Sequence, residues 1–178
     1  QDIYKANEEQ LRIINNFLTL YHYESGKFEL NMQPCNIQEL INDVISILQP
    51  LAMEKESEIT KDIASDLPEI SVDSGEIKRV ITNLLDNAIK HTKKGTKIHV
   101  TANKAYNEIL VSIHDNGTGI PEDEKPNIFQ KYPTTKRKIG TGLGLYISKQ
   151  IIDAHKGKIW FESEEEKGTT FYFALPIS

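Results

Sequence analysis

The stretch VDSGEIKRVITNLLDNAIKHT, residues 72–92, has the clearest helical periodicity in the sequence. Asp73 is expected to cap this helix, and Glu76 can close a capping box with it. Apolar residues recur every three or four positions and predict one buried face, made of Ile77, Val80, Ile81, Leu84, Leu85 and Ala88. Such a helix is stable only when another layer of structure covers that face.

The same helix carries a polar side. Asn83, Asn87, Lys90 and His91 are spaced by four, three and one, so they share one side of the helix. Two amides and a lysine suit a magnesium–phosphate group, because amide oxygens ligate the hard cation while the ammonium meets the phosphate. An ordinary solvated polar face is the alternative.

The elements predicted on both sides of this helix define the fold class. A helix is expected to start at the Asn36 cap and to end or kink at Pro50. Another is expected over about 142–155. Strands are predicted at EITKDI, near Ile70, and at KIHVTAN, EILVSIHD, KIWFES and TTFYFALP. Helices and strands do not alternate regularly, which favours an α/β two-layer sandwich with a mixed sheet backed by helices.

DNGTGIP, residues 115–121, follows directly after a predicted strand. An aspartate at a strand end beside two glycines can accept a hydrogen bond from a ligand amine in a tight pocket. Asp-Asn-Gly is also common turn chemistry, so a plain turn is the alternative.

A glycine-rich loop lies further along, in IGTGLGLYISKQI, residues 139–151. Without Cβ atoms its backbone N–H groups can approach an anion closely, and the following helix start adds unpaired N–H groups. A flexible joint is the alternative. Directly before it, Lys136, Arg137 and Lys138 form a basic cluster, either a lid over phosphates or a solvated charge run.

Length and composition limit the class of protein. The chain has 178 residues, 38% of them hydrophobic, and a formal net charge of -5. These values suit one globular domain and argue against general nucleic-acid binding, which needs a basic face. Cys35 is the only cysteine, so no internal disulfide is expected. No apolar run approaches the roughly 20 residues that span a bilayer, and we expect a cytoplasmic location.

Five stretches occur in a fixed order: NLLDNAIKH, DNGTGI, IFQKY, GTGLGL and KGTTFYF. In this order the sequence resembles the catalytic, ATP-binding domain of sensor histidine kinases, from about residue 35 to residue 177. That family belongs to a superfamily with gyrase, Hsp90 and the mismatch-repair ATPases. The resemblance implies a Bergerat fold, with the nucleotide between helices and a mobile lid over residues 121–141.

The resemblance also assigns a site for ATP and Mg²⁺. Asn87 would ligate the ion with support from Asn83, Lys90 would meet phosphate, and Asp115 would accept the adenine amino group. The full expected ATP-binding set is Asn83, Asn87, Lys90, His91, Asp115, Gly117, Gly119, Ile120, Arg137, Gly140, Thr141, Gly142, Leu143, Gly144, Thr169 and Thr170.

Position 83 separates classes within the superfamily. The ATP-hydrolysing relatives typically carry a glutamate there as the general base, whereas an amide cannot take a proton at neutral pH. We therefore expect transfer of the γ-phosphate to a histidine and relay to a response regulator aspartate. A non-catalytic nucleotide-binding module, or an ATPase or serine kinase of the same superfamily, is the alternative.

The N-terminal segment is expected to be an amphipathic helix over residues 1–23. Residues 1–26 resemble the end of the second helix of a dimerisation hairpin, and residues 27–178 the catalytic domain. The family's phosphoacceptor motif is not found around His22, so the acceptor histidine is expected on a hairpin absent from this chain. Expected partners are ATP or ADP, a receiver domain, and a second copy through that hairpin, with no nucleic acid.

Overall fold

The computed structural model describes residues 29–91, 95–131 and 142–177, together with Gln10, Ile14, Leu18 and Tyr21. In chain order the elements are β1 (Gln33–Cys35), α2 (Ile37–Glu54), β2 (Glu58–Ile63), β3 (Ile70–Val72), α3 (Ser74–Lys90), β4 (Lys97–Ala105), β5 (Glu108–Asp115), the short 3-10 helix η1 (Lys125–Asn127), α4 (Gly144–Ala154), β6 (Lys158–Glu164) and β7 (Gly168–Pro176).

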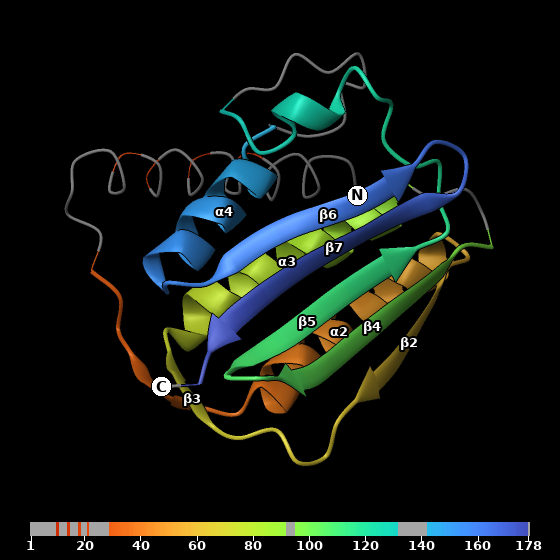
Figure 1. The fold of residues 1–178 in the computed structure, drawn as a ribbon. Coiled ribbons are helices and arrows are strands. Elements are labelled where there is room, and N and C mark those ends of the chain that lie inside the picture. The colour runs from red at the N-terminus through yellow and green to blue at the C-terminus, as the bar shows by residue number, and fades with distance from the viewer. Residues whose placement is uncertain are drawn as a thin grey trace.

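Five strands form one mixed sheet in the order β2-β4-β5-β7-β6 (Figure 1). β2 runs parallel to β4, and every other neighbouring pair in this sheet is antiparallel. β1 and β3 make a separate two-stranded antiparallel pair. The predicted mixed sheet is therefore confirmed.

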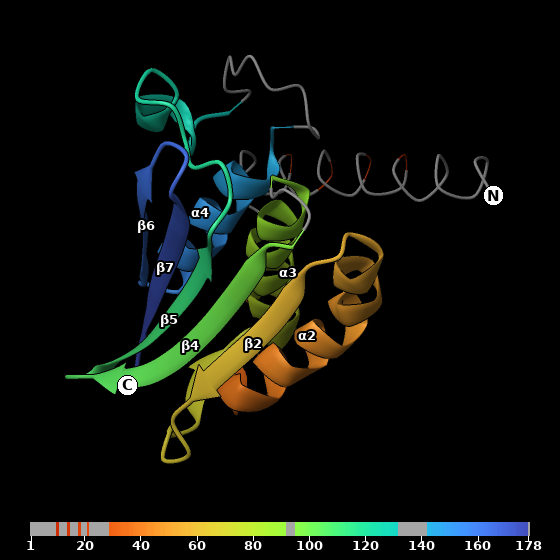
Figure 2. The same ribbon diagram turned by 90° about the vertical axis from the view of Figure 1, so that its right-hand side faces the viewer.

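The three helices α2, α3 and α4 all cover the same face of the sheet, which Figure 2 shows nearly edge-on. The core lies between these layers, where side chains such as Ile81, Leu84, Val111 and Phe173 have no exposed surface. Burying each such side chain contributes about 1.5–3 kcal/mol to folding. The two-layer α/β sandwich expected from the sequence is confirmed.

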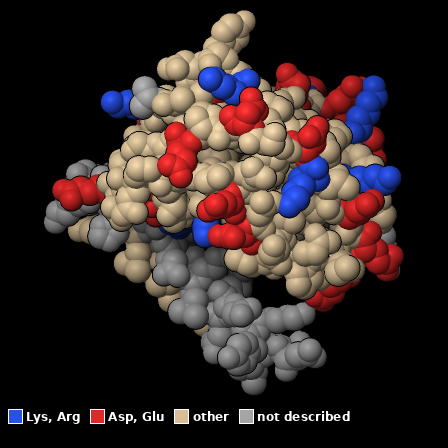
Figure 3. Space-filling model, turned by 90° about the horizontal axis from the view of Figure 1, so that it is seen from below, with Lys and Arg blue, Asp and Glu red and all other residues tan. Residues whose placement is uncertain are grey.

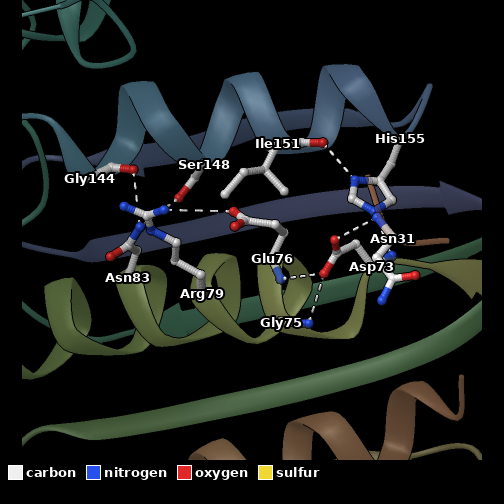
Figure 4. A network of polar contacts seen from close by, with 10 residues as sticks. All are labelled: Asn31, Asp73, Gly75, Glu76, Arg79, Asn83, Gly144, Ser148, Ile151 and His155. Atoms are coloured by element: carbon white, nitrogen blue, oxygen red, sulfur yellow. Dashed lines mark hydrogen bonds and ion pairs between the residues drawn. The ribbon is translucent and has the colours of Figure 1, made fainter. Parts of the chain in front are cut away.

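α3 lies at the centre of the helical layer and buries the predicted face completely or nearly so. Asp73 caps it, because its Oδ1 accepts from the backbone N–H groups of Gly75 and Glu76, each at 3.1 Å. The return bond of the expected capping box is not made. The Asp73 N–H donates instead to His155 Nε2 at 3.0 Å, since the Glu76 side chain turns toward α4 (Figure 4).

α2 begins as predicted at Asn36, whose Oδ1 accepts from the N–H of Gln38 at 2.9 Å. Of the two outcomes expected at Pro50, an end or a kink, the end is wrong, because the helix continues to Glu54. A proline inside a helix removes one hydrogen bond. Leu48 and Ala52, on either side of Pro50, are buried, and this packing holds the helix together across the gap.

Parts of two predicted segments lie outside the described residues. The predicted lid is described only up to Lys131, so Lys136, Arg137, Lys138, Gly140 and Thr141 are not described. Of the N-terminal helix, Gln10, Ile14, Leu18 and Tyr21 are described and helical, and the last three expose more than half of their surface.

Charged side chains of both signs are interspersed on the face of the molecule seen in Figure 3. Acidic and basic groups are scattered among uncharged residues in this view, a distribution typical of a solvated surface.

Among the described helices, none combines the length and the apolar character that crossing a bilayer requires.

Candidate functional site

Asp115 ends β5 and has only 5% of its surface exposed. Its Oδ1 accepts from the Gly117 N–H at 2.9 Å, and it also accepts from the backbone N–H of Thr169. Burial raises the pKa of this carboxyl, while the two backbone donors and nearby His114 oppose the shift. The result is a buried carboxylate held in one orientation at the end of a central strand.

The loop after Asp115 is held tightly against the hairpin of β6 and β7. Gly119 has φ +66°, and a Cβ there would lie 2.1 Å from the Glu164 carbonyl oxygen. The Ile120 N–H donates to Ser163 Oγ at 2.8 Å. Both contacts need a close backbone approach, so a glycine at 119 is a steric requirement of this loop.

The two threonines expected in the site lie on opposite faces of the sheet. Thr169 pairs with Asp115 across the strands and is 5% exposed. Thr170 is the next residue, so its side chain points to the other face, where its hydroxyl bonds His114 Nδ1 at 2.9 Å. The structure therefore brings Thr169 to Asp115 but does not bring the Thr170 side chain there.

The polar side of α3 lies beside this loop. The Thr118 hydroxyl donates to the His91 carbonyl at 3.4 Å, which joins the loop to the end of α3. Lys90 makes an ion pair with Asp86 at 2.6 Å, one turn back on α3. The side-chain amide of Asn87 makes no hydrogen bond to any residue that the structure describes, so its oxygen is available to a ligand.

Asn83 contacts the start of α4. Its Nδ2 donates to the Gly144 carbonyl and to Ser148 Oγ, both at 3.3 Å. Gly142 has φ +67°, which favours glycine, and Leu143 beside it is buried. A Cβ on Gly144 would approach Asn83 no closer than 3.7 Å, so this contact does not itself demand glycine.

The sequence did not single out two serines that connect these parts. Ser163 on β6 accepts from Ile120, donates to the Gly168 carbonyl at 3.0 Å and contacts Thr169 Oγ1 at 2.9 Å. Ser148 on α4 is fully buried. Ser148 could have been noticed from the sequence, because it is a polar residue on the apolar face of a predicted helix. Ser163 could not, because a serine is ordinary at a polar position of an alternating strand.

Glu76 lies in the polar part of the contact between α3 and α4 (Figure 4). Its Oε2 is buried without a hydrogen bond, and Arg79 Nη1 lies 3.7 Å away. Burial raises the pKa of Glu76; Arg79 opposes this shift, and Asp73 adds to it. Ionised Glu76 therefore lowers the free energy of unfolding relative to its neutral form.

The substitution Glu76→Gln tests that cost through the pH dependence of stability. Because the folded-state pKa is raised, protonation stabilises the fold below the unfolded value of 4.5, and this contribution is lost as pH rises through the folded pKa. We expect Glu76→Gln to raise the free energy of unfolding at pH 7 by up to about 1 kcal/mol, with no gain near pH 4. Urea unfolding from pH 4 to pH 8 measures this, and a loss at pH 7 would show that Arg79 outweighs burial.

Comparison with known proteins identifies the family. Residues 72–178 match the family described as histidine kinase-, DNA gyrase B-, and HSP90-like ATPase. The chain is 37% identical over 170 residues to the adaptive-response sensory kinase SasA of Synechocystis sp., covering 93% of this chain and 44% of SasA. The chain spans no more than about half of the curated relatives that it matches first.

Solved structures agree. The catalytic domain of the histidine kinase ThkA is 33% identical with a TM-score of 0.73, over 83% of this chain and 96% of that domain. ThkA in complex with the response regulator TrrA matches at 28% identity and a TM-score of 0.77, over 97% of this chain and 49% of that chain. Full-length ShkA in complex with AMPPNP matches at 27% identity and a TM-score of 0.88, over 98% of this chain and 37% of that chain.

These matches cover the elements that carry Asp115, the polar side of α3 and the start of α4. They confirm the resemblance that the five ordered stretches indicated. The chain belongs to the histidine kinase-, DNA gyrase B-, and HSP90-like ATPase family, and within it to the catalytic domains of histidine kinases.

Proposed function

We propose that this domain binds Mg–ATP beside α3 and transfers the γ-phosphate to a histidine on a helical hairpin, for relay to a response regulator aspartate. In the transfer, an imidazole nitrogen forms a bond to the γ-phosphorus while the bond from that phosphorus to the bridging oxygen breaks, and ADP leaves. The observation that carries the proposal is the buried, oriented carboxylate of Asp115 in a member of this family.

Asp115 would select adenine by accepting a hydrogen bond from its amino group. The carboxylate already accepts from Gly117 and Thr169, and a base amine is the kind of donor that its remaining lone pairs suit. Gly117, Gly119 and Ile120 would form the wall of the base pocket, since their loop is held close to β6 and β7.

Mg²⁺ fits the donors on α3. The Asn87 amide is without a hydrogen bond among the described residues. The Asn83 amide uses its NH2 group to donate to α4. Both side chains can therefore offer their oxygen, the ligand atom that Mg²⁺ prefers. Bound there, the ion would neutralise charge on the phosphates. Lys90 would leave Asp86 for a phosphate, and His91 would lie along the nucleotide.

The glycine loop would close over the phosphates. Gly142, Leu143 and Gly144 lead into α4, whose N-cap residue makes no side-chain capping hydrogen bond, and N–H groups at a helix start suit an anion. The other members that we assign to this part are Arg137, Gly140 and Thr141.

An amide at position 83 supports transfer over hydrolysis. Asn83 cannot take a proton from water at neutral pH, so the site has no general base there. A regulatory module that binds nucleotide without transfer, and an ATPase or serine kinase, remain the second and third candidates.

We further propose that residues 1–26 are the end of a dimerisation helix and residues 27–178 the catalytic domain. The exposed apolar side chains of Ile14, Leu18 and Tyr21 support a helix that packs against a second copy. The complex of ThkA with TrrA supports a receiver domain as partner. Use of ATP supports a cytoplasmic location.

Calorimetric titration with Mg–ATP and Mg–GTP, followed by radiolabelled transfer to a hairpin supplied in trans, tests the proposal. We expect binding that is selective for ATP, an acid-labile phosphohistidine on the hairpin, and phosphate release no faster than without protein. Replacing Asn87 by Ala should remove the dependence on Mg²⁺ and weaken binding about tenfold or more.

Each result separates the candidates. ATP binding without phosphohistidine would favour the regulatory module, and rapid release of phosphate would favour an ATPase. Equal affinity for GTP and ATP would refute the assigned base pocket.

A further inference from the structure

α4 is held on α3 by polar contacts at both of its ends, which Figure 4 shows in one view. Between these ends the two helices pack through buried apolar residues such as Ile147, Ile151 and Ile77. Apolar packing alone is non-directional, whereas hydrogen bonds at two ends define where one helix lies along the other.

At the first end, Asn83 donates to two atoms one turn apart on α4. Both the Gly144 carbonyl and the Ser148 hydroxyl lie 3.3 Å from its Nδ2. Gly144 is the first residue of α4, and Ser148 has no exposed surface. A buried hydroxyl and a helix carbonyl therefore hold one amide group in place.

These contacts also orient the amide. Because Nδ2 makes both of these contacts, they use the donor group of the Asn83 amide and leave its Oδ1 as the acceptor. A carboxylate at position 83 would set a negative oxygen against the Gly144 carbonyl, which is a repulsive contact. An asparagine at position 83 therefore suits the two acceptors on α4, because its NH2 group can donate to both.

At the second end, His155 follows the last turn of α4 and is 3% exposed. Its Nε2 accepts from the Asp73 N–H at 3.0 Å, so Nδ1 carries the proton and donates to the Ile151 carbonyl at 2.8 Å. Asp73 caps α3 and also accepts from the Asn31 N–H through Oδ2 at 2.9 Å. This end ties α4 to the start of α3.

We propose that Ser148 is a positioning residue for the nucleotide site: through Asn83 it sets both the orientation of that amide and the location of the α4 start. This inference rests on the proposed function, because the ligand is the Mg–ATP assigned above. Ser148 itself would not touch the nucleotide.

The experiment compares Ser148→Ala and Ser148→Cys with the wild type. Cysteine nearly preserves the volume but is a weak acceptor, so it separates hydrogen bonding from packing. We expect both variants to bind Mg–ATP about threefold to tenfold more weakly by calorimetry. Without nucleotide, hydrogen exchange of the amides of residues 143–147 should be faster in both.

Thr82→Ala is the matched control. Its hydroxyl donates to the Lys78 carbonyl at 2.8 Å within α3, next to Asn83 in the chain. This variant should shift the urea midpoint but leave both Mg–ATP affinity and exchange at the α4 start unchanged. A double-mutant cycle of Asn83→Ala with Ser148→Ala should be non-additive in exchange, because both changes remove the Asn83–Ser148 contact.

Wild-type affinity and wild-type exchange in both Ser148 variants would overturn the inference. Affinity loss in Ser148→Ala that Ser148→Cys restores would also overturn it, since packing would then be the cause. If the wild type itself binds no Mg–ATP, the proposed function fails, and exchange at the α4 start still decides whether Ser148 positions this helix.

Discussion

Replacing Asp115 by Asn should lower Mg–ATP affinity about 5-fold to 150-fold while leaving the fold intact. The Gly117 N–H needs an acceptor at 2.9 Å, so the new amide keeps its oxygen there and directs its NH2 group toward the base. Two donors then face each other, the adenine amine and the new amide. An unpaired buried donor costs about 1–3 kcal/mol, which gives the range stated.

The folding stability of Asp115→Asn should not fall with its ATP affinity and should stay the same or rise. Burial raises the pKa of Asp115, so the carboxylate costs folding free energy at pH 7, and a neutral amide removes that cost. We expect Asp115→Asn to unfold at the same or a higher urea concentration than the wild type at pH 7. The difference should shrink as pH falls through the folded-state pKa and should vanish below the ordinary value of 3.8, because the wild-type group is then protonated in both states.

Calorimetry and urea unfolding on the same protein preparation separate these two effects. Asp153→Asn is the control, because Asp153 forms an exposed ion pair with Lys149 at 2.9 Å and lies at the far end of α4. It should change neither property by much. Retained ATP affinity in Asp115→Asn would show that the carboxylate does not read the base.

Gly168→Ala should destabilise the fold by at least about 3 kcal/mol, because the added methyl group would clash with the backbone of a neighbouring strand. Gly168 begins β7 with φ +113°, and a Cβ there would lie 2.0 Å from the Asp115 carbonyl oxygen. Relief requires β7 to move away from the end of β5. That movement would also displace Thr169, whose N–H bonds the Asp115 carboxylate, so ATP affinity should fall as well.

Gly95→Ala measures the cost of a positive φ for a residue with a Cβ, without any steric clash. Gly95 has φ +80°, but nothing lies within 4 Å of its virtual Cβ. We expect this control to cost about 1–2 kcal/mol and to leave ATP affinity unchanged. Urea unfolding of the two variants gives the steric part by difference, and equal losses would show that the close contact relaxes without consequence.

Local pattern was enough to predict most of the elements. The buried face of α3, the cap residues Asn36 and Asp73, and the strands of the sheet were each predicted from spacing and side-chain type. Such features depend on residues a few positions apart, so the chain itself contains the information. The order of the five motif stretches likewise indicated the family before any fold was known.

The partners of polar side chains were decided by the tertiary structure. Asn83 meets Gly144 and Ser148, 61 and 65 positions away, and Asp73 meets His155 at a separation of 82. No local rule specifies such pairs, because they depend on how α4 docks on α3. The same docking turned Glu76 away from its expected capping bond, and burial on both sides of Pro50 lets α2 continue past that proline.

Two adjacent residues, Thr169 and Thr170, show most clearly what sequence can predict and what only the tertiary structure decides. The sequence indicated both Thr169 and Thr170 as neighbours of the base, because a motif names positions but not directions. Once β7 pairs with β5, the alternation of a strand sends Thr169 to the buried side with Asp115 and Thr170 to the outer side with His114. Sequence alone therefore determined most of the elements and the family, because both depend on local pattern and motif order, whereas strand register and helix docking decided which side chains share a face with Asp115.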